Sequence, residues 1–213
     1  MGAAPAGSLG TASADSLEVR WIIRGRLDED IRDWFARFPA GTEARADAYL
    51  VWPRLGGLSV KLRDGSVLDV KSYLGSPGTL NLPHSGRGRL ESWRKWSFPY
   101  DPPAQVHAPD RGWVVVRKRR LSTWFPLAAG QDPAPAPQPS ALPGCTAELT
   151  EADAFGDAWW SVGLEATGPA GLLHGALQHA ADLVFARPLP AGTGFSLENS
   201  RSYAQWLSQL STR

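Results

Sequence analysis

Alternation of charged and apolar residues is the most regular pattern along this chain. In the segment 17–23, Glu18 and Arg20 alternate with apolar neighbours, and the same alternation recurs around Lys61, Lys71 and Lys118. Successive side chains of a strand point to opposite faces, so each charged set lies on one face of its strand. The polar face of an ordinary sheet is a solvating mixture. Repeated Lys, Arg and Glu, mostly basic, instead predict a charged groove or barrel lumen that binds an anion.

The same reading predicts eight strands and a few helices. A helix is expected after Asp28, which has the features of an N-cap, because Ile31, Trp34 and Phe35 follow at helical spacing. Asp64-Gly65 predicts a hairpin turn. Two more helices are expected at about 170–186, with Leu183 on its apolar side, and 203–210. The strands are expected at 16–24, 49–52, 58–63, 66–73, 89–98, 113–125, 146–150 and 159–167, with loops at 75–88, 99–111 and 132–144.

These elements predict one α+β domain. The fold class is an eight-stranded, mostly antiparallel β-barrel, or tunnel, with a few flanking α-helices. The domain is expected to span residues 16–213 of a 213-residue chain, which is an ordinary length for one domain. Residues 1–15 are small and polar and predict a disordered tail. The Pro-rich segment 132–144 is expected to be a loop within the domain.

Composition limits the function classes. The formal net charge is +1, so any basic site is local, and no field steers the protein onto nucleic acid. The run Arg117-Lys118-Arg119-Arg120 is expected to place Lys118 and Arg120 alone on the lumen side, because alternate strand residues face opposite ways. The histidines have no metal-ligand spacing, and no P-loop or nucleophile elbow is visible.

Location and partners follow from the same features. Cys145, the single cysteine, excludes an internal disulfide and is read as a small buried hydrophobe. No apolar run is long enough for a membrane helix, and the first residues do not form a signal peptide. We therefore expect a cytoplasmic protein whose partner is a small anion, neither nucleic acid nor membrane; that this anion is phosphorylated is implied by the family resemblance described below. The oligomeric state is left open.

Carboxylates on the predicted strands allow two interpretations. Glu18, Glu91, Glu148 and Glu165 all fall on strands. Each could pair with a neighbouring base and fix the register of the barrel. Alternatively, two or three of them could converge as the oxygen ligands that Mg²⁺ or Mn²⁺ prefers, with the metal held partly through phosphates of a substrate.

The order of these motifs resembles the CYTH domain, or triphosphate tunnel metalloenzyme, family. That family opens on a Glu-x-Glu-x-Lys strand, continues through basic strands and ends on a Glu-x-Glu strand and a helix. The matching segments are Glu18-Val19-Arg20-Trp21-Ile22, Lys61-Leu62-Arg63, Leu68-Asp69-Val70-Lys71, Arg89-Leu90-Glu91, Lys118-Arg119-Arg120, Glu165-Ala166-Thr167, and Ser202-Tyr203 with Trp206-Leu207.

The resemblance implies a tunnel that binds triphosphates with a divalent metal, as a triphosphatase or, with less support, a nucleotide cyclase. It implies catalytic roles for Glu18, Glu165 and Glu91, and metal ligation of Mg²⁺ or Mn²⁺ by Glu18, Glu165 and Glu148. The substrate-binding residues implied are Arg20, Lys61, Arg63, Lys71, Lys95, Lys118 and Arg120.

The first and the last acidic motif depart from the family pattern, and these departures leave more than one function open. Arg20 and Thr167 stand where the second glutamate of each acidic pair is expected, and Ile22 replaces the lysine. The leading hypothesis is binding, with or without hydrolysis, of a triphosphate, nucleotide or polyphosphate. The alternative is a catalytically inactive binding or sensor module for a phosphorylated metabolite. A third reading is a structural or partner-binding protein whose lumen is neutralised by its own ion pairs.

Overall fold

The computed structural model describes residues 13–52, 57–100, 112–127, 134–140 and 142–212. It contains three α-helices, α1 (Glu29–Ala36), α2 (Leu173–Phe185) and α3 (Tyr203–Ser211), with 3-10 turns at Pro83–Ser85 and Ala170–Leu172. The strands are β1 (Ser13–Arg24), β2 (Gly41–Leu50), β3 (Leu58–Arg63), β4 (Val67–Asn81), β5 (Arg87–Pro99), β6 (Trp113–Pro126), β7 (Gly144–Ala154) and β8 (Asp157–Thr167).

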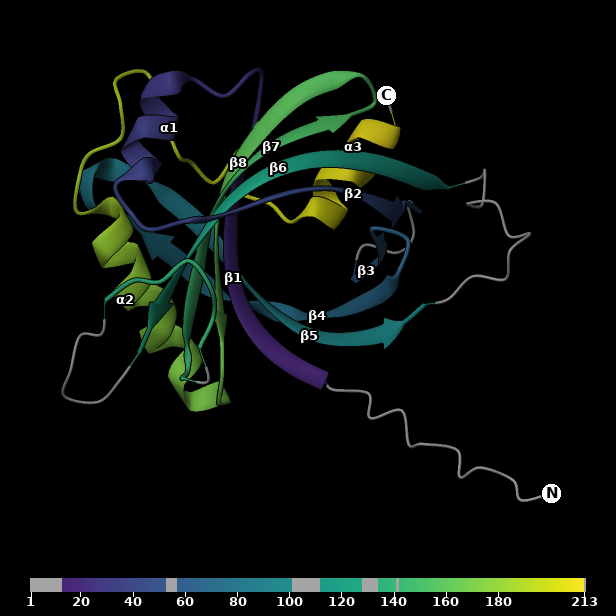
Figure 1. The fold of residues 1–213 in the computed structure, drawn as a ribbon, viewed down its shortest axis with the longest axis horizontal. Helices are drawn as coiled ribbons and strands as arrows, with labels where there is room; N and C mark the ends of the chain where they lie inside the picture. The colour runs from purple at the N-terminus through teal and green to yellow at the C-terminus, as the bar shows by residue number, and fades with distance from the viewer. Residues whose placement is uncertain (1–12, 53–56, 101–111, 128–133, 141, 213) are drawn as a thin grey trace.

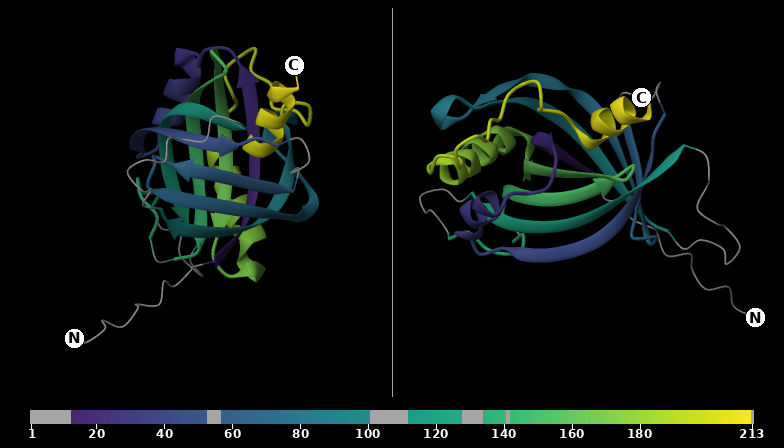
Figure 2. Two further views of the ribbon diagram at one scale, coloured as in Figure 1. Left: turned by 90° about the vertical axis from the view of Figure 1, so that its right-hand side faces the viewer. Right: turned by 90° about the horizontal axis from the view of Figure 1, so that it is seen from above.

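The eight strands close into one barrel. Their order around it is β1-β5-β4-β3-β2-β6-β7-β8, and every neighbouring pair is antiparallel. Figure 1 shows the strands curving around a central space, with α1 and α2 on one side of the barrel and α3 against another part of it. Figure 2 shows the same arrangement from two further directions. The predicted α+β barrel with flanking helices is confirmed.

Several strands are longer than expected; β5 (Arg87–Pro99) and β7 (Gly144–Ala154) extend beyond 89–98 and 146–150, and three other differences are described here. β2 begins at Gly41 rather than residue 49. β4 continues to Asn81 through a segment expected to be loop, because Gly75 and Gly78 adopt positive φ and form an irregular, bulged stretch that still pairs with β5. β1 begins at Ser13, three residues before the expected domain boundary, and residues 1–12 of the expected tail lie outside the described residues.

Part of the Pro-rich segment is bound to the barrel. The backbone N–H groups of Ala136 and Trp124 each donate to the carbonyl oxygen of the other residue, at 2.9 and 2.7 Å. The indole Nε1 of Trp124 also donates to Ser140 Oγ at 3.2 Å. Ala136 therefore forms an isolated bridge with Trp124 of β6. Residues 132, 133 and 141, and residues 101–111 of the loop expected at 99–111, lie outside the described residues.

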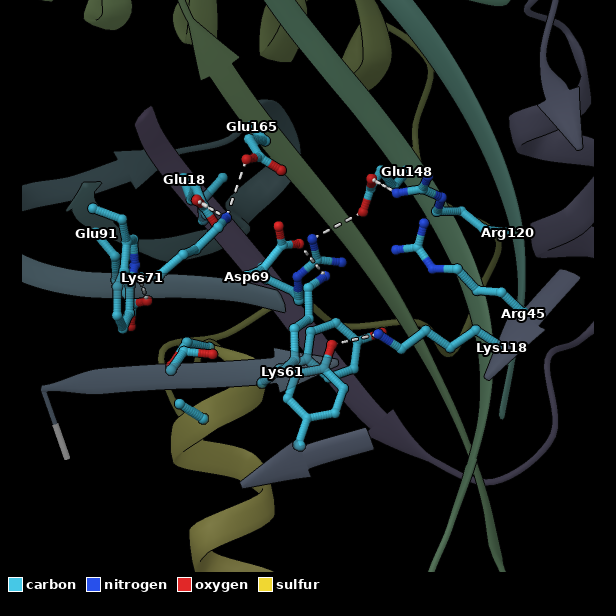
Figure 3. Close-up of a pocket in the computed structure, with 18 residues that line it drawn as sticks. Glu18, Arg45, Lys61, Asp69, Lys71, Glu91, Lys118, Arg120, Glu148 and Glu165 are labelled. Carbon is cyan, nitrogen blue, oxygen red and sulfur yellow. Dashed lines mark hydrogen bonds and ion pairs between the residues drawn. The ribbon is translucent and has the colours of Figure 1, made fainter. Parts of the chain in front are cut away.

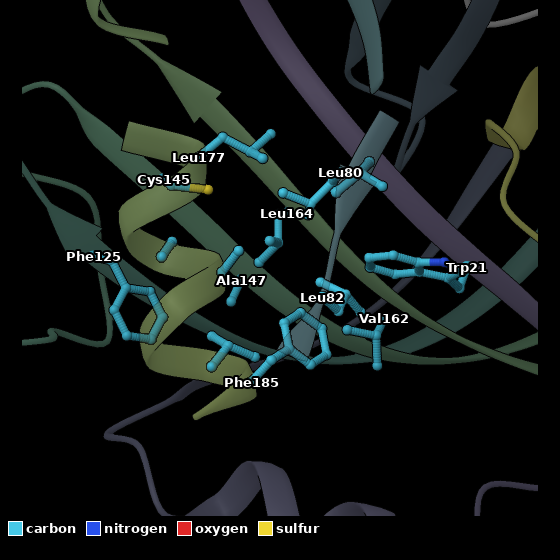
Figure 4. Packing of buried hydrophobic residues seen from close by; sticks show 14 of the residues in the cluster. Trp21, Leu80, Leu82, Phe125, Cys145, Ala147, Val162, Leu164, Leu177 and Phe185 are labelled. Atoms are coloured by element: carbon cyan, nitrogen blue, oxygen red, sulfur yellow. The ribbon is translucent and has the colours of Figure 1, made fainter. Parts of the chain in front are cut away.

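The main hydrophobic core lies between the outer wall of the barrel and the helices. Alternate residues of β1, β7 and β8 point outward and pack against α2, as Figure 4 shows for Leu177 and Phe185 of that helix beside Val162 and Leu164. Cys145 is a free thiol buried in this core, as expected. Leu183, expected on the apolar side of α2, is instead 40% exposed. The apolar face is thus outside the barrel, which leaves the lumen to the charged residues.

A second apolar cluster closes one end of the lumen. Ile22, Val116 and Trp159 continue the inward-facing rows of β1, β6 and β8, and they pack against Trp206 and Leu207 of α3. Ser202 is the N-cap of α3, and its hydroxyl accepts from the N–H of Gln205. The helix therefore caps the barrel where β1 ends and β6 begins. None of the helices in the described ranges has the length and apolar character needed to cross a membrane.

Substitution of Gly88 tests the packing of the main hydrophobic core, to which Trp21 and Val19 belong. An added Cβ at Gly88 would lie 2.4 Å from side-chain atoms of both Trp21 and Val19. We expect Gly88→Ala to lower the free energy of unfolding by about 1–3 kcal/mol, as overpacking does, measured by urea denaturation. Gly194→Ala is the control, because an added Cβ there meets nothing within 4 Å. Equal stability of the two variants would contradict the described contact.

Candidate functional site

The barrel encloses a charged cavity that offers about 90 Å³ to the centres of water molecules. This is enough for several ordered waters, since one needs about 10–15 Å³ by this measure. Figure 3 shows the lining side chains converging from the barrel wall. The charged residues that line it are Glu18, Arg20, Arg45, Lys61, Asp69, Lys71, Glu91, Lys118, Arg120, Glu148 and Glu165.

Lys71 joins two of the expected metal ligands. Its ammonium nitrogen lies 2.6 Å from Glu18 Oε1 and 3.1 Å from Glu165 Oε1. Burial by itself would lower the pKa of Lys71, but the two carboxylates outweigh this effect and raise the pKa above its ordinary value. Burial would raise the pKa of Glu165, but the positive charge of Lys71 outweighs this effect and lowers the pKa below its ordinary value. Lys71 therefore carries a fixed positive charge at the point where the two acids meet.

Glu148 is held between two guanidinium groups. Arg20 Nη2 lies 3.0 Å from Glu148 Oε2, and Arg120 Nη1 donates to Oε1. Burial would raise the pKa of Glu148, but Arg120 and Arg20 hold the pKa far below its ordinary value. Gly163 makes room for this arrangement, because a Cβ there would lie 2.7 Å from the guanidinium of Arg20. Glu148 is thus ionised and doubly paired.

A dense group of cations lies on the opposite wall around Asp47, which is completely buried. Lys118 donates to Asp47 Oδ2 at 3.0 Å, and Arg45 Nε lies 3.2 Å from Oδ1. Lys61 lies 3.7 Å from Asp47 and 3.6 Å from Asp69, too far for a strong hydrogen bond to either. Lys61 is therefore the most weakly paired of these cations.

The pKa values of Lys61 and Lys118 are lowered by burial and by neighbouring positive charges. Burial, followed by the positive charge of Lys118, lowers the pKa of Lys61 to about 7. Burial lowers the pKa of Lys118 to about 8, although Asp47 partly opposes the shift. A lowered lysine pKa means that the local environment disfavours one more positive charge. An anion placed beside Lys61 would remove that penalty.

Glu91 has a different environment from the other lumen glutamates. It is 4% exposed, and Trp93 Nε1 donates to its Oε2 at 3.1 Å. Its Oε1 has no hydrogen-bond partner among the described residues. Burial raises the pKa of Glu91, and the neighbouring Glu18 raises it further, whereas the Trp93 hydrogen bond partly opposes the rise.

Most of the residues expected at the site line the cavity: Glu18, Arg20, Lys61, Lys71, Glu91, Lys118, Arg120, Glu148 and Glu165. Arg63 and Lys95 do not line it. They lie behind Asp69, which Arg63 pairs with and from which Lys95 Nζ is 3.7 Å away. The outward placement expected for the neighbours of Lys118 and Arg120 is confirmed, since Arg117 and Arg119 are exposed.

The lumen is less basic than the alternation predicted. Sequence reasoning missed Arg45 and Asp47 because residues 41–48 were not expected to form a strand, and it gave no role to Asp69. The signal was present, since Glu43, Arg45 and Asp47 alternate with Ala44 and Ala46. Alanine is depleted in strands, however, so the alternation was weak evidence. Tyr49 and Tyr203 were also missed; their rings stack with centroids 5.8 Å apart beside Lys118.

The residues present do not fit the divalent metal that the resemblance implied. The ammonium of Lys71 lies between Glu18 and Glu165, and Arg20 and Arg120 occupy Glu148. Within the described ranges, no group of three or more His, Cys, Asp or Glu side chains is placed to hold a metal ion. The arrangement can hold a multiply charged anion, with arginines as bidentate donors and lysines as point charges.

No model of a protein family matches this chain, and no curated protein matches it either. Solved structures with a similar fold include the PH1819 protein from Pyrococcus horikoshii OT3, with 16% identity over 92% of this chain and 99% of that one and a TM-score of 0.44. A conserved hypothetical protein from Pyrococcus furiosus has 16% identity over 88% of this chain and 98% of its own, with a TM-score of 0.45.

A third similar structure is the S. pombe Pct1 RNA triphosphatase in complex with the Spt5 CTD. It is 10% identical over 82% of this chain and 77% of that one, with a TM-score of 0.39. With TM-scores this low, the three likenesses carry no argument about what the present chain does. The site is therefore interpreted from the closed antiparallel barrel and its charged lumen.

Proposed function

We propose that the lumen binds a small phosphorylated anion, namely a triphosphate, a nucleotide or a short polyphosphate, without a divalent metal. The crowding of cations around Lys61 carries this proposal. Lys61 lacks a close carboxylate partner, and its lowered pKa reflects repulsion by Lys118 and Arg63 as well as burial. Because buried charges are costly unless compensated, an anion with several charges is the ligand that such a wall favours.

Arg45, Lys118 and Arg120 support the same conclusion. They come from β2 and β6, which are neighbours in the barrel, and face the cavity together with Lys61 of β3. Arg45 and Arg120 present planar forks that match phosphate oxygens, whereas the lysines add charge with freer geometry. A cytoplasmic setting, expected from the free Cys145, would suit a phosphorylated metabolite and remains a prediction.

Metal-dependent hydrolysis is the second candidate, because the lumen also holds Glu18, Glu165 and Glu148. For that mechanism these carboxylates would have to hold a divalent metal, which would supply Lewis-acid chemistry for phosphoryl transfer. Here built-in cations already pair with these acids. The ion pairs therefore favour a binding or sensor module over a triphosphatase or a nucleotide cyclase.

Neighbouring arginines of β6 provide a matched test of anion binding. Arg120 faces the lumen, and Arg119 is exposed on the outer side of the same strand. We expect Arg120→Gln to weaken tripolyphosphate binding by about tenfold or more, since a charge-assisted contact is lost, while Arg119→Gln leaves it unchanged. Isothermal titration calorimetry measures both. Wild-type affinity in the two variants, or no binding to the native protein, would rule out the lumen as the anion site.

The pH dependence of binding follows from the lowered pKa of Lys61, about 7. A bound anion favours the charged lysine and raises this pKa, so binding above pH 7 takes up a proton. Affinity should therefore fall as pH rises from 7 to 9, by up to about tenfold per pH unit for one proton. Calorimetry in buffers of different ionisation enthalpy counts the protons, and Lys61→Met serves as the control that lacks the uptake by Lys61 and keeps that by Lys118, whose pKa is about 8. Identical pH profiles of the two proteins would contradict the assignment.

Turnover separates the two candidate functions. We expect no phosphate release from tripolyphosphate, thiamine triphosphate, ATP or GTP, with or without Mn²⁺, and no change in binding affinity when Mn²⁺ or EDTA is added. The physical reason is that Lys71 lies between Glu18 and Glu165. Release that requires Mn²⁺ and disappears in Glu18→Gln would instead establish the hydrolase.

A further inference from the structure

Acidic and basic side chains divide the lumen into two halves. Four neighbouring strands, β7, β8, β1 and β5, each contribute one glutamate to the cavity: Glu148, Glu165, Glu18 and Glu91. The other four neighbouring strands, β4, β3, β2 and β6, contribute five of the six lining cations together with Asp69, and the sixth cation is Arg20 of β1. Figure 3 shows Glu18, Glu91 and Glu165 on one side and Arg45, Lys118 and Arg120 on the other. A simple anion would use only the second half.

Three of these glutamates form a row, which we call the glutamate row: Glu91, Glu18 and Glu165. Glu18 is the register partner of Glu91 on β5 and of Glu165 on β8. Residues directly opposite each other on antiparallel strands have Cβ atoms about 4.5–5.5 Å apart, and like charges in such pairs are unfavourable. Lys71 pairs with Glu18 and Glu165, whereas Glu91 has no ion pair among the described residues.

The Oε1 atom of Glu91 lacks a hydrogen-bond donor among the described residues. Its side chain is almost completely buried and lines the cavity, yet its Oε1 has no partner within the described ranges. A buried polar atom without a partner costs about 1–3 kcal/mol, so a ligand that donates a hydrogen bond to it would bind more tightly. The carboxylates of Glu18 and Glu165 beside it favour a donor with a positive charge.

Aromatic rings lie at the same place. Trp93 lines the cavity next to Glu91, and its ring packs against Tyr73 with centroids 5.1 Å apart. Aromatic faces attract alkylammonium groups. A carboxyl oxygen without a partner, flanking carboxylates and an aromatic wall together form a site for an organic cation rather than for a hydrated metal ion.

We propose that the ligand is a phosphorylated amine: its phosphates contact the basic half of the lumen, and its ammonium group contacts Glu91 and the rest of the glutamate row beside Trp93. This inference rests on the proposed anion binding, which it makes more specific. It gives the acids of this half a ligand to bind in a lumen that does not fit a metal.

A series of stable probes tests this proposal. Pamidronate, alendronate and neridronate carry a bisphosphonate and an amine on progressively longer chains, and etidronate carries the bisphosphonate without an amine. Calorimetric affinities would be measured for the native protein, Glu91→Gln, Glu165→Gln and the control Glu198→Gln, whose glutamate is exposed outside the lumen. Glu91→Gln keeps an oxygen that can accept from Trp93 Nε1, and circular dichroism checks that each variant is folded.

The expected result is that at least one amine probe binds the native protein and Glu198→Gln about tenfold more tightly than etidronate, as a charge-assisted contact implies. This preference should fall to about threefold or less in Glu91→Gln, with etidronate affinity retained. Glu165→Gln should reduce the preference in the same direction and covers the case in which Glu91→Gln does not fold.

The other outcomes overturn one proposal or both. Equal binding of amine probes and etidronate would overturn the amine site and leave anion binding intact. An amine preference that survives in both glutamate variants would overturn its assignment to the glutamate row. Absence of binding by all four probes, together with absence of tripolyphosphate binding, would overturn the proposed function itself.

Discussion

Compensation of buried charge is the constraint on which this structure depends. Taking an ion out of water costs several kcal/mol even after relaxation, and the barrel encloses many of them. The protein meets this cost with paired networks: Lys71 with two glutamates, Glu148 with two arginines, and Asp47 with Arg45 and Lys118. Removing one member of such a network leaves its partner charged and buried. The lumen is therefore a set of interdependent pairs.

These networks do not compensate every buried charged or polar group equally. Lys61 has cations around it and carboxylates at a distance, and Glu91 has an oxygen without a partner. These two deficits have opposite sign and lie on β3 and β5, which β4 alone separates in the barrel. A lumen neutralised only for structural reasons has no need of either deficit. The proposed anion would compensate the charge of Lys61, and the proposed ammonium group would supply the hydrogen-bond donor that Glu91 lacks among the described residues.

The sequence was informative where charged residues alternate with good strand formers. β1, β3 and β6 follow this rule, because Val and Leu alternate with Lys, Arg and Glu, and their inward faces could be assigned before any coordinates. β2 was largely missed because alanines occupy its outward positions, and the far part of β4 because its Gly and Pro residues form a bulge rather than a loop. The ion pairs of Lys71 could not be predicted, although its place on the lumen face was. Its partners are 53 and 94 residues away in the chain, and only closure of the barrel brings them together.

The cap formed by α3 has a consequence for the size of the guest. Ser202, Tyr203 and Ala204 line the cavity, and Trp206 and Leu207 are packed behind them on the inner wall. A chain molecule cannot thread through a tube that is plugged in this way. A long polymer could insert only its terminal groups, whereas a compact metabolite could be engulfed whole. With α3 in place, the barrel can bind the terminal groups of a polymer or a whole small molecule, but a polymer cannot pass through it.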